Sequence, residues 1–289
     1  MPAEGLGFIG LGVMGEPICR NILKKAGREM AVFDLSPEPL ERLGAEGARV
    51  CGSVDKVAAQ AEVIVLSLPG GPQVEAVVGE LLPHLREGQV VVDTSTALVG
   101  LTRELASRLA EKGVRMADAP VARTRQAAID GTLSIMVGAD EALFAEIEPL
   151  LRHAASDVTL CGGIGCGQVV KIMNNMVLFQ TVVALSEALA LGEGAGVDRR
   201  TLFETLSKGS ADSFALRNHG MKAMIPDEFP KGAFPTDYAL KDVSYALDLA
   251  RELSLAAPGA ELAEARMKVA KAAGFGAEYF PVLARVTGK

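Results

Sequence analysis

The sequence predicts an α/β domain with a doubly wound, mostly parallel sheet, followed by an all-α domain that begins with a long interdomain helix. Three observations support this fold class. A chain of 289 residues is too long for one ordinary hydrophobic core. Short apolar runs alternate with helical patterns through the first half, as in βαβ units, and only helical patterns follow residue 163. We therefore expect domains at residues 1–163 and 164–289.

The apolar runs of the first half have the character of strands buried on both faces of a parallel sheet. These runs are residues 5–9, 30–33, 63–68, 90–92, 114–118 and 133–137. Helical spacing between them predicts helices at residues 13–26, 37–46, 54–59, 74–85, 101–112 and 141–151.

The second half opens with a segment that has no proline, residues 166–193. As one helix it would be roughly 40 Å long. It is apolar on nearly every face, so we expect it to be buried in a core or against a partner subunit, as in a homodimer or homotetramer. Polar residues interrupt the apolar stretch 176–191, which argues against a membrane span. Further helices are expected at residues 199–208, 214–224, 238–253, 258–273 and 277–285.

Charge and cysteine content exclude several classes of partner. The net charge of −7 and the lack of a dense basic run argue against binding to nucleic acid or an anionic membrane. The four cysteines form no C-x-x-C pair and none lies near a histidine, so we expect no metal site and four reduced thiols. The first fifteen residues lack the basic and apolar regions of a secretory signal. We expect a cytoplasmic protein.

A glycine-rich string stands between the first predicted strand and the first predicted helix. It reads Gly10-Leu11-Gly12-Val13-Met14-Gly15. Gly10 permits a tight turn, Gly12 lets the backbone approach a pyrophosphate, and Gly15 allows close helix–strand packing. The N–H groups at the helix N-terminus then face the phosphates. In this strand–turn–helix context the string predicts a Rossmann dinucleotide site.

The expected cofactor is NAD rather than NADP. Asp34 ends the second predicted strand, 24 residues after Gly10. A carboxylate at this place accepts hydrogen bonds from both ribose hydroxyls and repels a 2′-phosphate. No arginine follows it. The alternative, an ordinary turn aspartate before Pro37, stays open.

Several ordered motifs extend over most of the chain. They are the string at residues 8–22, Leu68-Pro69, the tetrapeptide at 93–96, the segment 118–138, the segment 165–175 and Lys241-Asp242. With these motifs the chain resembles the β-hydroxyacid dehydrogenase family, which includes 3-hydroxyisobutyrate dehydrogenase and tartronate semialdehyde reductase. The resemblance implies a Rossmann domain, a long interdomain helix, a helical cap and an active site in the cleft.

The resemblance also implies residue roles. Lys171 would be the catalytic acid/base and Asn175 would orient the substrate. The implied cofactor contacts are residues 10–15, Asp34, Leu68, Pro69, Gln73, Ser95, Thr96 and Lys241. The implied substrate contacts are Ser95, Ala122, Arg123, Thr124, Lys171, Asn174 and Asn175.

The residue types suit the removal of a hydride and a proton from a hydroxy acid. Lys171 and Asn175 are four residues apart and so share one helix face. Partial burial and a positive nicotinamide ring both disfavour the ammonium form, which favours the neutral amine that a general base requires. The expected reaction is hydride transfer between NAD and a small 3-hydroxy acid or the corresponding semialdehyde.

The segment at 122–124 departs from the family pattern. Most relatives have Ser-Gly-Gly where this chain has Ala122-Arg123-Thr124. A guanidinium suits a carboxylate, sulfonate or phosphate, and the pair Arg-Thr resembles that of sulfolactaldehyde reductases. Those enzymes tend to have serine where this chain has Leu178. Reduction of a sulfonated or other anionic small aldehyde is therefore an alternative function.

Plainer interpretations also stay open. Lys171 could be a surface residue whose stem covers apolar neighbours, and Arg123 could be a solvated loop residue. Ser95 and Thr96 could be turn residues at a strand end, and Lys241 could form an ordinary i, i+4 pair with Asp237. A non-catalytic dinucleotide-binding protein is the alternative of another class, although both Lys171 and Asn175 are present. An imine reductase usually lacks the lysine, and a 6-phosphogluconate dehydrogenase needs a larger helical domain.

Overall fold

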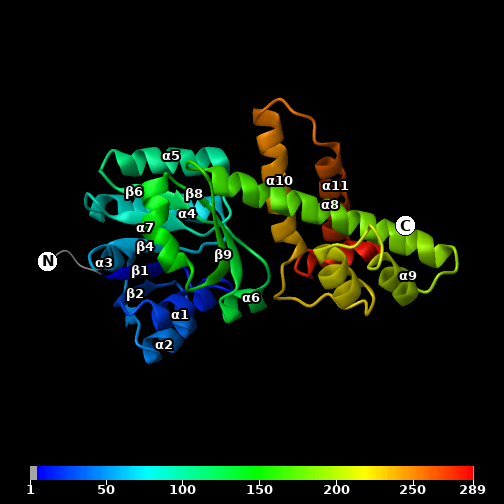
Figure 1. The fold of residues 1–289 in the computed structure, drawn as a ribbon, viewed down its shortest axis with the longest axis horizontal. Helices are drawn as coiled ribbons and strands as arrows, with labels where there is room; N and C mark the ends of the chain where they lie inside the picture. The colour runs from blue at the N-terminus through cyan, green and yellow to red at the C-terminus, as the bar shows by residue number, and fades with distance from the viewer. Residues whose placement is uncertain (1–4, 289) are drawn as a thin grey trace. The chain divides into compact units, whose positions relative to one another are not determined.

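The computed structural model describes residues 5–288, and the chain divides into two compact units, Met1–Lys171 and Ile172–Lys289. Helix α8 (Cys166–Gly194) begins in the first unit and continues through the second (Figure 1). The predicted boundary between residues 163 and 164 lies in the glycine-rich turn just before α8.

The first unit is built on one mixed sheet, which confirms the predicted α/β class. Its strands are β1 (Leu6–Ile9), β2 (Met30–Phe33), β3 (Arg49–Val50), β4 (Val63–Leu66), β5 (Val90–Asp93), β6 (Arg115–Asp118), β7 (Val121–Ala122), β8 (Leu133–Gly138) and β9 (Ala155–Gly162). The order is β3-β2-β1-β4-β5-β6-β8-β7, with β9 paired to β8. The six strands β1 to β6 are parallel to one another, whereas β8 is antiparallel to both β6 and β7.

Helices cover both faces of this sheet (Figure 1). One face packs against α1 (Gly15–Lys25), α2 (Pro37–Ala45), α6 (Arg125–Asp130) and α7 (Glu141–Leu151). The other packs against α3 (Val54–Ala58), α4 (Gly71–Leu81) and α5 (Val99–Ala110). Alternate residues of one strand therefore enter different cores: Val65 of β4 lies in the first and Ile64 in the second. Burial on both sides explains why these strands are continuous apolar runs.

Four elements of the first unit were missed in the sequence. Strands β3 and β7 have two residues each, and α6 has six. Strand β9 is longer, but several of its side chains are exposed at the edge of the sheet, so it lacks the apolar run of a central strand. Helix α6 begins after Thr124, whose hydroxyl accepts a hydrogen bond from the N–H of Ala127.

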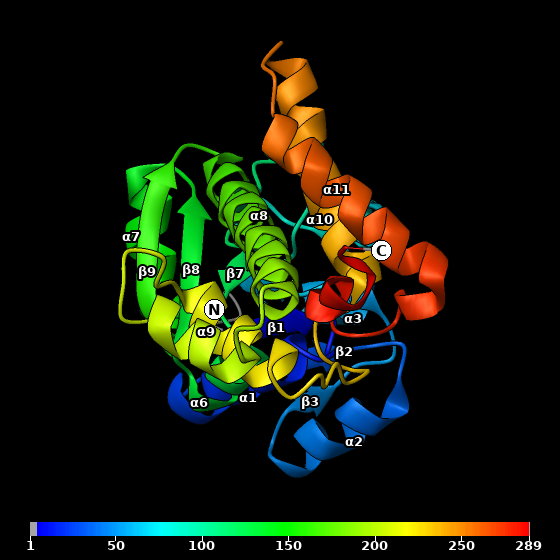
Figure 2. The same ribbon diagram turned by 90° about the vertical axis from the view of Figure 1, so that its right-hand side faces the viewer.

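The second unit is all-α, as predicted (Figure 2). After α8 come α9 (Arg199–Leu206), the π-helix Leu216–Met224, α10 (Thr236–Glu252), α11 (Pro258–Ala270), a second π-helix Lys271–Phe275 and the 3₁₀ helix Phe280–Val286. Helices α10 and α11 lie side by side. Phe179 of α8 packs edge-on against Phe280, with ring centroids 5.3 Å apart, in the centre of the core.

Helix α8 is long and apolar enough to cross a membrane by length and composition alone, a test that the core helix of a soluble protein also passes. Its middle supplies Phe179, Val182 and Val183 to the core of the second unit. The predicted burial in a core is therefore confirmed for one face, while Val177 and Leu191 are exposed.

Candidate active site

The glycine loop, residues 10–15, is crowded at its ends and open in its middle. Gly10 has φ +94°, and a Cβ there would lie 2.3 Å from the carbonyl oxygen of Ser67. A Cβ on Gly15 would lie 2.0 Å from the carbonyl oxygen of Gly10. Gly12 is exposed, and a Cβ there would meet no atom within 4 Å. The turn therefore needs glycine at positions 10 and 15 for its own packing. At Gly12 the missing side chain leaves space in which a bound ligand could approach the backbone.

Asp34 lies against this loop. Its Oδ2 accepts a hydrogen bond of 2.5 Å from the N–H of Leu11, and its Oδ1 accepts one of 2.7 Å from the N–H of Ser36. The carboxylate is thus fixed at the end of β2 while the side chain stays half-buried. Each carboxylate oxygen has a second lone pair with which it can accept a further hydrogen bond.

These residues fit a dinucleotide. Residues 11–14 and the N-terminus of α1, where Met14 provides no side-chain cap, would hold the pyrophosphate. The open space at Gly12 admits a phosphate close to the backbone, and Asp34 would accept the ribose hydroxyls. The sequence motif and the geometry of the glycine loop therefore both indicate a dinucleotide site.

Two further loops come from the carboxyl ends of β4 and β5. Leu68, Pro69 and Gln73 follow β4, and Pro69 and Gln73 are exposed. The Ser95 loop, residues 94–98, follows β5, and the N–H of Leu68 donates a 2.8 Å hydrogen bond to the hydroxyl of Ser95. This hydrogen bond brings together the Leu68-Pro69 and Ser95-Thr96 segments that the sequence predicts as cofactor contacts. They meet at the carboxyl edge of the parallel strands, where folds of this class bind ligands.

The Ser95 loop rests on buried polar groups. The N–H of Ser95 donates to Oδ1 of Asp93 at 2.9 Å, and the hydroxyl of Thr94 donates to the carbonyl of Leu66 at 2.6 Å. Ser95 is buried, with its hydroxyl held by Leu68, whereas Thr96 is half-buried. Thr96 is thus the more accessible of the two predicted hydroxyls.

Two carboxyls are buried beneath this loop. Asp93 and Asp118 are partners across β5 and β6, and both are fully buried. Burial raises the pKa of Asp93 to about 7, against the opposing effect of its hydrogen bonds with Ser95. Burial also raises the pKa of Asp118 to about 6, although the N–H groups of Gly165 and Gln168 donate to its carboxylate. Oδ2 of Asp93 has no hydrogen-bond partner in the described chain.

A stability experiment checks the burial of Asp93. Because the pKa of Asp93 is higher in the folded state than in the unfolded state, its protonation stabilises the fold. This contribution to the free energy of unfolding is fully present below about pH 4 and is lost as the pH rises through 7. For Asp93 the loss between pH 5 and pH 8 is on the order of 3 kcal/mol. We expect Asp93→Asn to reduce this loss in urea unfolding at the two pH values, whereas Asp130→Asn, at an exposed position, leaves it unchanged. An unaltered slope in Asp93→Asn would contradict the assignment.

Lys171 lies half-buried on the second turn of α8, and Asn175 is buried one turn later. Nδ2 of Asn175 donates a 2.7 Å hydrogen bond to Oδ2 of Asp242, and the neighbouring Asn174 donates to Oδ1 of Asn175 at 3.0 Å. The carboxylate of Asp242 therefore fixes the amide of Asn175 with its oxygen as acceptor.

Lys241 lies beside the same carboxylate. Its Nζ is 3.3 Å from Oδ1 of Asp242 and 5.4 Å from the ring centroids of Tyr238 and Tyr245. Asp237, the partner that an i, i+4 pair would have used, instead lies 2.8 Å from Nζ of Lys271.

Arg123 occupies a strained position. Its φ is +86°, a conformation that suits glycine and strains an L-residue by about 1–2 kcal/mol. The guanidinium donates to the carbonyl of Thr132 at 2.5 Å, to Ser156 at 2.6 Å and to the carboxylate of Asp157 at 2.7 Å. The structure therefore places the guanidinium of Arg123 against Thr132 and the first residues of β9. Whether it also contacts substrate stays a prediction.

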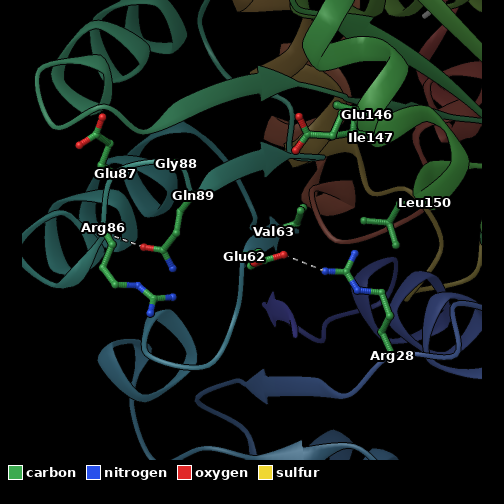
Figure 3. Close-up of a pocket in the computed structure, with 10 residues that line it drawn as sticks. All are labelled: Arg28, Glu62, Val63, Arg86, Glu87, Gly88, Gln89, Glu146, Ile147 and Leu150. Carbon is green, nitrogen blue, oxygen red and sulfur yellow. Dashed lines mark hydrogen bonds and ion pairs between the residues drawn. The ribbon is translucent and has the colours of Figure 1, made fainter. Parts of the chain in front are cut away.

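A cavity of about 570 Å³ lies elsewhere, at the amino ends of β4 and β5 (Figure 3). Arg28 and Glu62 form an ion pair of 3.5 Å in its lining, and Gln89 and Glu146 also line it. The cofactor loops are at the carboxyl ends of the same strands. This cavity is therefore separate from the candidate site.

Two sequence families match the chain in succession. Residues 5–163 match the NAD-binding domain of 6-phosphogluconate dehydrogenase, and residues 165–286 match the family described as NAD-binding of NADP-dependent 3-hydroxyisobutyrate dehydrogenase. Among curated relatives, 2-(hydroxymethyl)glutarate dehydrogenase of Eubacterium barkeri is 36% identical over 97% of this chain and 94% of its own. The chain belongs to the β-hydroxyacid dehydrogenase family. The predicted family and enzyme class are confirmed, and the cofactor is NAD.

Other members of the family are also similar to this enzyme. 2-Hydroxy-3-oxopropionate reductase of Escherichia coli is 37% identical over 88% of this chain and 86% of the relative. The structure of 3-hydroxyisobutyrate dehydrogenase from Mycobacterium tuberculosis, with L-serine, has a TM-score of 0.91 and 28% identity and covers 99% of both chains. An imine reductase from Pseudomonas, with 19% identity and a TM-score of 0.65, shares the fold.

The sequence reasoning missed the supporting groups of the enzyme's site. Asp93, Asp118 and Gln168 are fully buried polar residues, and they lie in the family motifs at residues 93–96, 118–138 and 165–175. A polar residue in an otherwise apolar buried segment is the signal that could have found them. Within residues 5–288 no group of three or more His, Cys, Asp or Glu could hold a metal ion, and all four cysteines are free thiols.

Proposed function

We propose that this enzyme interconverts a small 3-hydroxy acid and the corresponding semialdehyde with NAD, and that Lys171 is the general acid/base. The placement of Lys171 carries this proposal. It stands one turn after Gln168, a residue that ties the start of α8 to the Ser95 loop at the carboxyl edge of the sheet. The glycine loop leaves the same edge of that sheet, after β1.

The substrate class follows from what the relatives' substrates share. 3-Hydroxyisobutyrate, 2-(hydroxymethyl)glutarate, L-serine and 2-hydroxy-3-oxopropionate all have a one-carbon alcohol or aldehyde on the α-carbon of a carboxylate. Their other α-substituents differ. We propose the shared unit, HOCH₂–CHR–COO⁻ or its aldehyde, as the part that this enzyme recognises.

The mechanism divides between the cofactor and two helix residues. When bound, NAD supplies the hydride acceptor or donor. Lys171 takes the proton of the alcohol in the oxidative direction and returns it in the reductive one. The amide oxygen of Asn175 is directed by Asp242 and would accept a hydrogen bond from the substrate or from Lys171. Thr96, half-buried on its loop, and the backbone N–H groups of residues 122–124 are the proposed partners of the substrate carboxylate.

A rate screen tests this function. Purified protein is assayed with NAD and NADP against the four compounds above, each as the alcohol and as the semialdehyde, and against a sulfonated analogue of the semialdehyde. We expect turnover of at least one HOCH₂–CHR–COO⁻ compound with NAD. A clear preference for the sulfonate would favour the alternative function. Binding of NADH without turnover of any compound would favour a non-catalytic dinucleotide-binding protein.

Cofactor selection is a separate prediction. Because Asp34 places a fixed carboxylate beside Leu11, we expect kcat/KM to be higher with NAD than with NADP. Asp34→Asn removes the charge that repels a 2′-phosphate and should reduce this ratio by roughly 10-fold, the effect of about 1.4 kcal/mol. Asp55→Asn, an acid on α3, serves as the control. A wild type that prefers NADP would refute the role of Asp34.

The role of Arg123 can be tested against its partner. If the guanidinium exchanges Asp157 for an anionic substrate, Arg123→Ala should raise KM for the acid by about 30-fold and leave KM for NAD unchanged. Asp157→Ala releases the guanidinium and should leave KM for the acid unchanged or lower it. A rise of the same size in both variants would mean that the ion pair only shapes the loop, and wild-type values in both would make Arg123 a surface residue.

We also propose that the enzyme is cytoplasmic and homo-oligomeric. The exposed apolar residues Val177 and Leu191 of α8 support self-association. Sedimentation of the purified protein would decide between monomer, dimer and tetramer.

A further inference from the structure

Gln168 is a fully buried side chain that bridges two segments of the first unit. Its Nε2 donates a 2.8 Å hydrogen bond to the carbonyl of Ser95, and its Oε1 accepts one of 3.1 Å from the N–H of Ala97. The amide therefore holds the backbone on both sides of Thr96.

The backbone of the same helix turn is held as firmly. The N–H of Gly165 donates to Oδ1 of Asp118 at 2.6 Å, and the N–H of Gln168 donates to Oδ2 at 2.7 Å. Gly167 packs so closely that a Cβ would lie 2.4 Å from the carbonyl of Met136. The first turn of α8 is therefore fixed against β6 and β8, and Gln168 extends that fixation to the loop after β5.

We propose that Gln168 is the positioning residue of this enzyme: it sets the distance and angle between the Ser95 loop and the helix turn that carries Lys171. Lys171 follows Gln168 by three residues, a rise of about 4.5 Å along a rigid helix. Any slip of the first turn of α8 against the loop would thus move the amine relative to Thr96. The inference rests on the proposed role of Lys171, and a misplacement of about 1 Å in such a site can lower the rate by 10²-fold.

The chemistry of the bridge selects glutamine. The carbonyl of Ser95 needs a donor and the N–H of Ala97 needs an acceptor, and an uncharged amide supplies both. In Gln168→Glu one carboxylate oxygen would face the carbonyl of Ser95, and a negative charge would be buried at a site where the hydrogen-bond partners of the Gln168 side chain within residues 5–288 include no cation to pair with it. Gln168→Met keeps the length but leaves both backbone groups without their partner, which destabilises a buried site.

The same domain contains a matched control. Gln89, at the opposite end of β5, is also buried, and its Nε2 donates to the carbonyls of Ala58 and Ala61 at 2.8 and 2.6 Å. Its Oε1 accepts from the N–H of Arg86 at 2.5 Å. Gln89→Met therefore removes three hydrogen bonds of a buried amide, against two in Gln168→Met, at the opposite end of β5 from the Ser95 loop.

The experiment compares Gln168→Met, Gln168→Glu and Gln89→Met. We expect all three to lower the melting temperature. Only the Gln168 variants should lower kcat, by at least about 10-fold, with KM for NAD within about 3-fold of wild type. A second measurement needs no cofactor: the rate of reductive methylation of Lys171, followed by mass spectrometry across pH. Its pH dependence should shift in the Gln168 variants and match the wild type in Gln89→Met.

The outcomes separate the two proposals. Wild-type kcat in Gln168→Met, or equal losses of kcat in Gln168→Met and Gln89→Met, would overturn the positioning role. An unshifted methylation profile in both Gln168 variants would overturn it as well. If instead Lys171→Ala keeps full activity, the acid/base assignment fails, and the methylation profile still tests whether Gln168 controls the surroundings of Lys171.

Discussion

Replacing Lys171 by alanine is expected to lower kcat by at least about 100-fold while NADH still binds. General acid/base catalysis contributes about 10²–10⁴-fold to a rate, and alanine leaves no group of the right reach on this turn of α8. The glycine loop and Asp34 hold the cofactor in the proposal without help from Lys171, so NADH affinity should stay within a few-fold of wild type. Stopped-flow and fluorescence titration measure the two quantities separately.

The pH dependence and two control variants sharpen this test. The titration that limits kcat in the wild type should disappear from the residual activity of Lys171→Ala, because the titrating base has been removed. Lys171→Arg keeps a positive charge but cannot deprotonate, so it should be nearly as slow. Lys208→Ala, at an exposed position just after α9, should behave as wild type. A kcat within a few-fold of wild type in Lys171→Ala would remove the residue from the mechanism.

The central strands could be predicted from the sequence because each one shows its burial in its own run of apolar residues. Strands β1, β2, β4 and β5 are buried on both faces, and their continuous apolar runs show this directly. Among the described strands, β9 pairs with β8 and has a solvent-exposed side, so polar and apolar residues are mixed in its sequence. Its pairing depends on a partner strand that the local pattern does not indicate.

In the candidate site, too, the features set by a residue's own segment were predictable, and those that depend on distant partners were not. Gly10, Gly15 and Asp34 were predictable because a tight turn, a close contact and a charge at a strand end require those residue types. The partner of Arg123 was not predictable, since Asp157 lies 34 residues later on a strand that the sequence did not reveal. Gln168 was overlooked for a related reason: its two partners, Ser95 and Ala97, are brought to it by the sheet.

Gly12 offers the sharpest test of the cofactor site. Gly12→Val should raise the Kd for NADH by at least about 100-fold without destabilising the protein. A Cβ added at Gly12 meets no atom within 4 Å in the chain itself, the position is exposed, and Gly12 has no positive φ that would strain valine. A bound pyrophosphate would meet it, and crowding of 1–3 kcal/mol together with a lost hydrogen bond to a charged group of about 1.5–3 kcal/mol gives this loss.

Two further glycines show whether that loss is specific. Gly15→Ala would place a Cβ 2.0 Å from the carbonyl oxygen of Gly10, so it should lower the melting temperature as well as NADH affinity. Gly79→Val, at an open position on α4, should change neither. The diagnostic result is therefore the separation in Gly12→Val: an unchanged melting temperature without NADH, and no rise of that temperature when NADH is added at concentrations that stabilise the wild type. If Gly12→Val binds NADH with wild-type affinity, the pyrophosphate does not pass over the glycine loop, and the assignment of residues 10–15 must be abandoned.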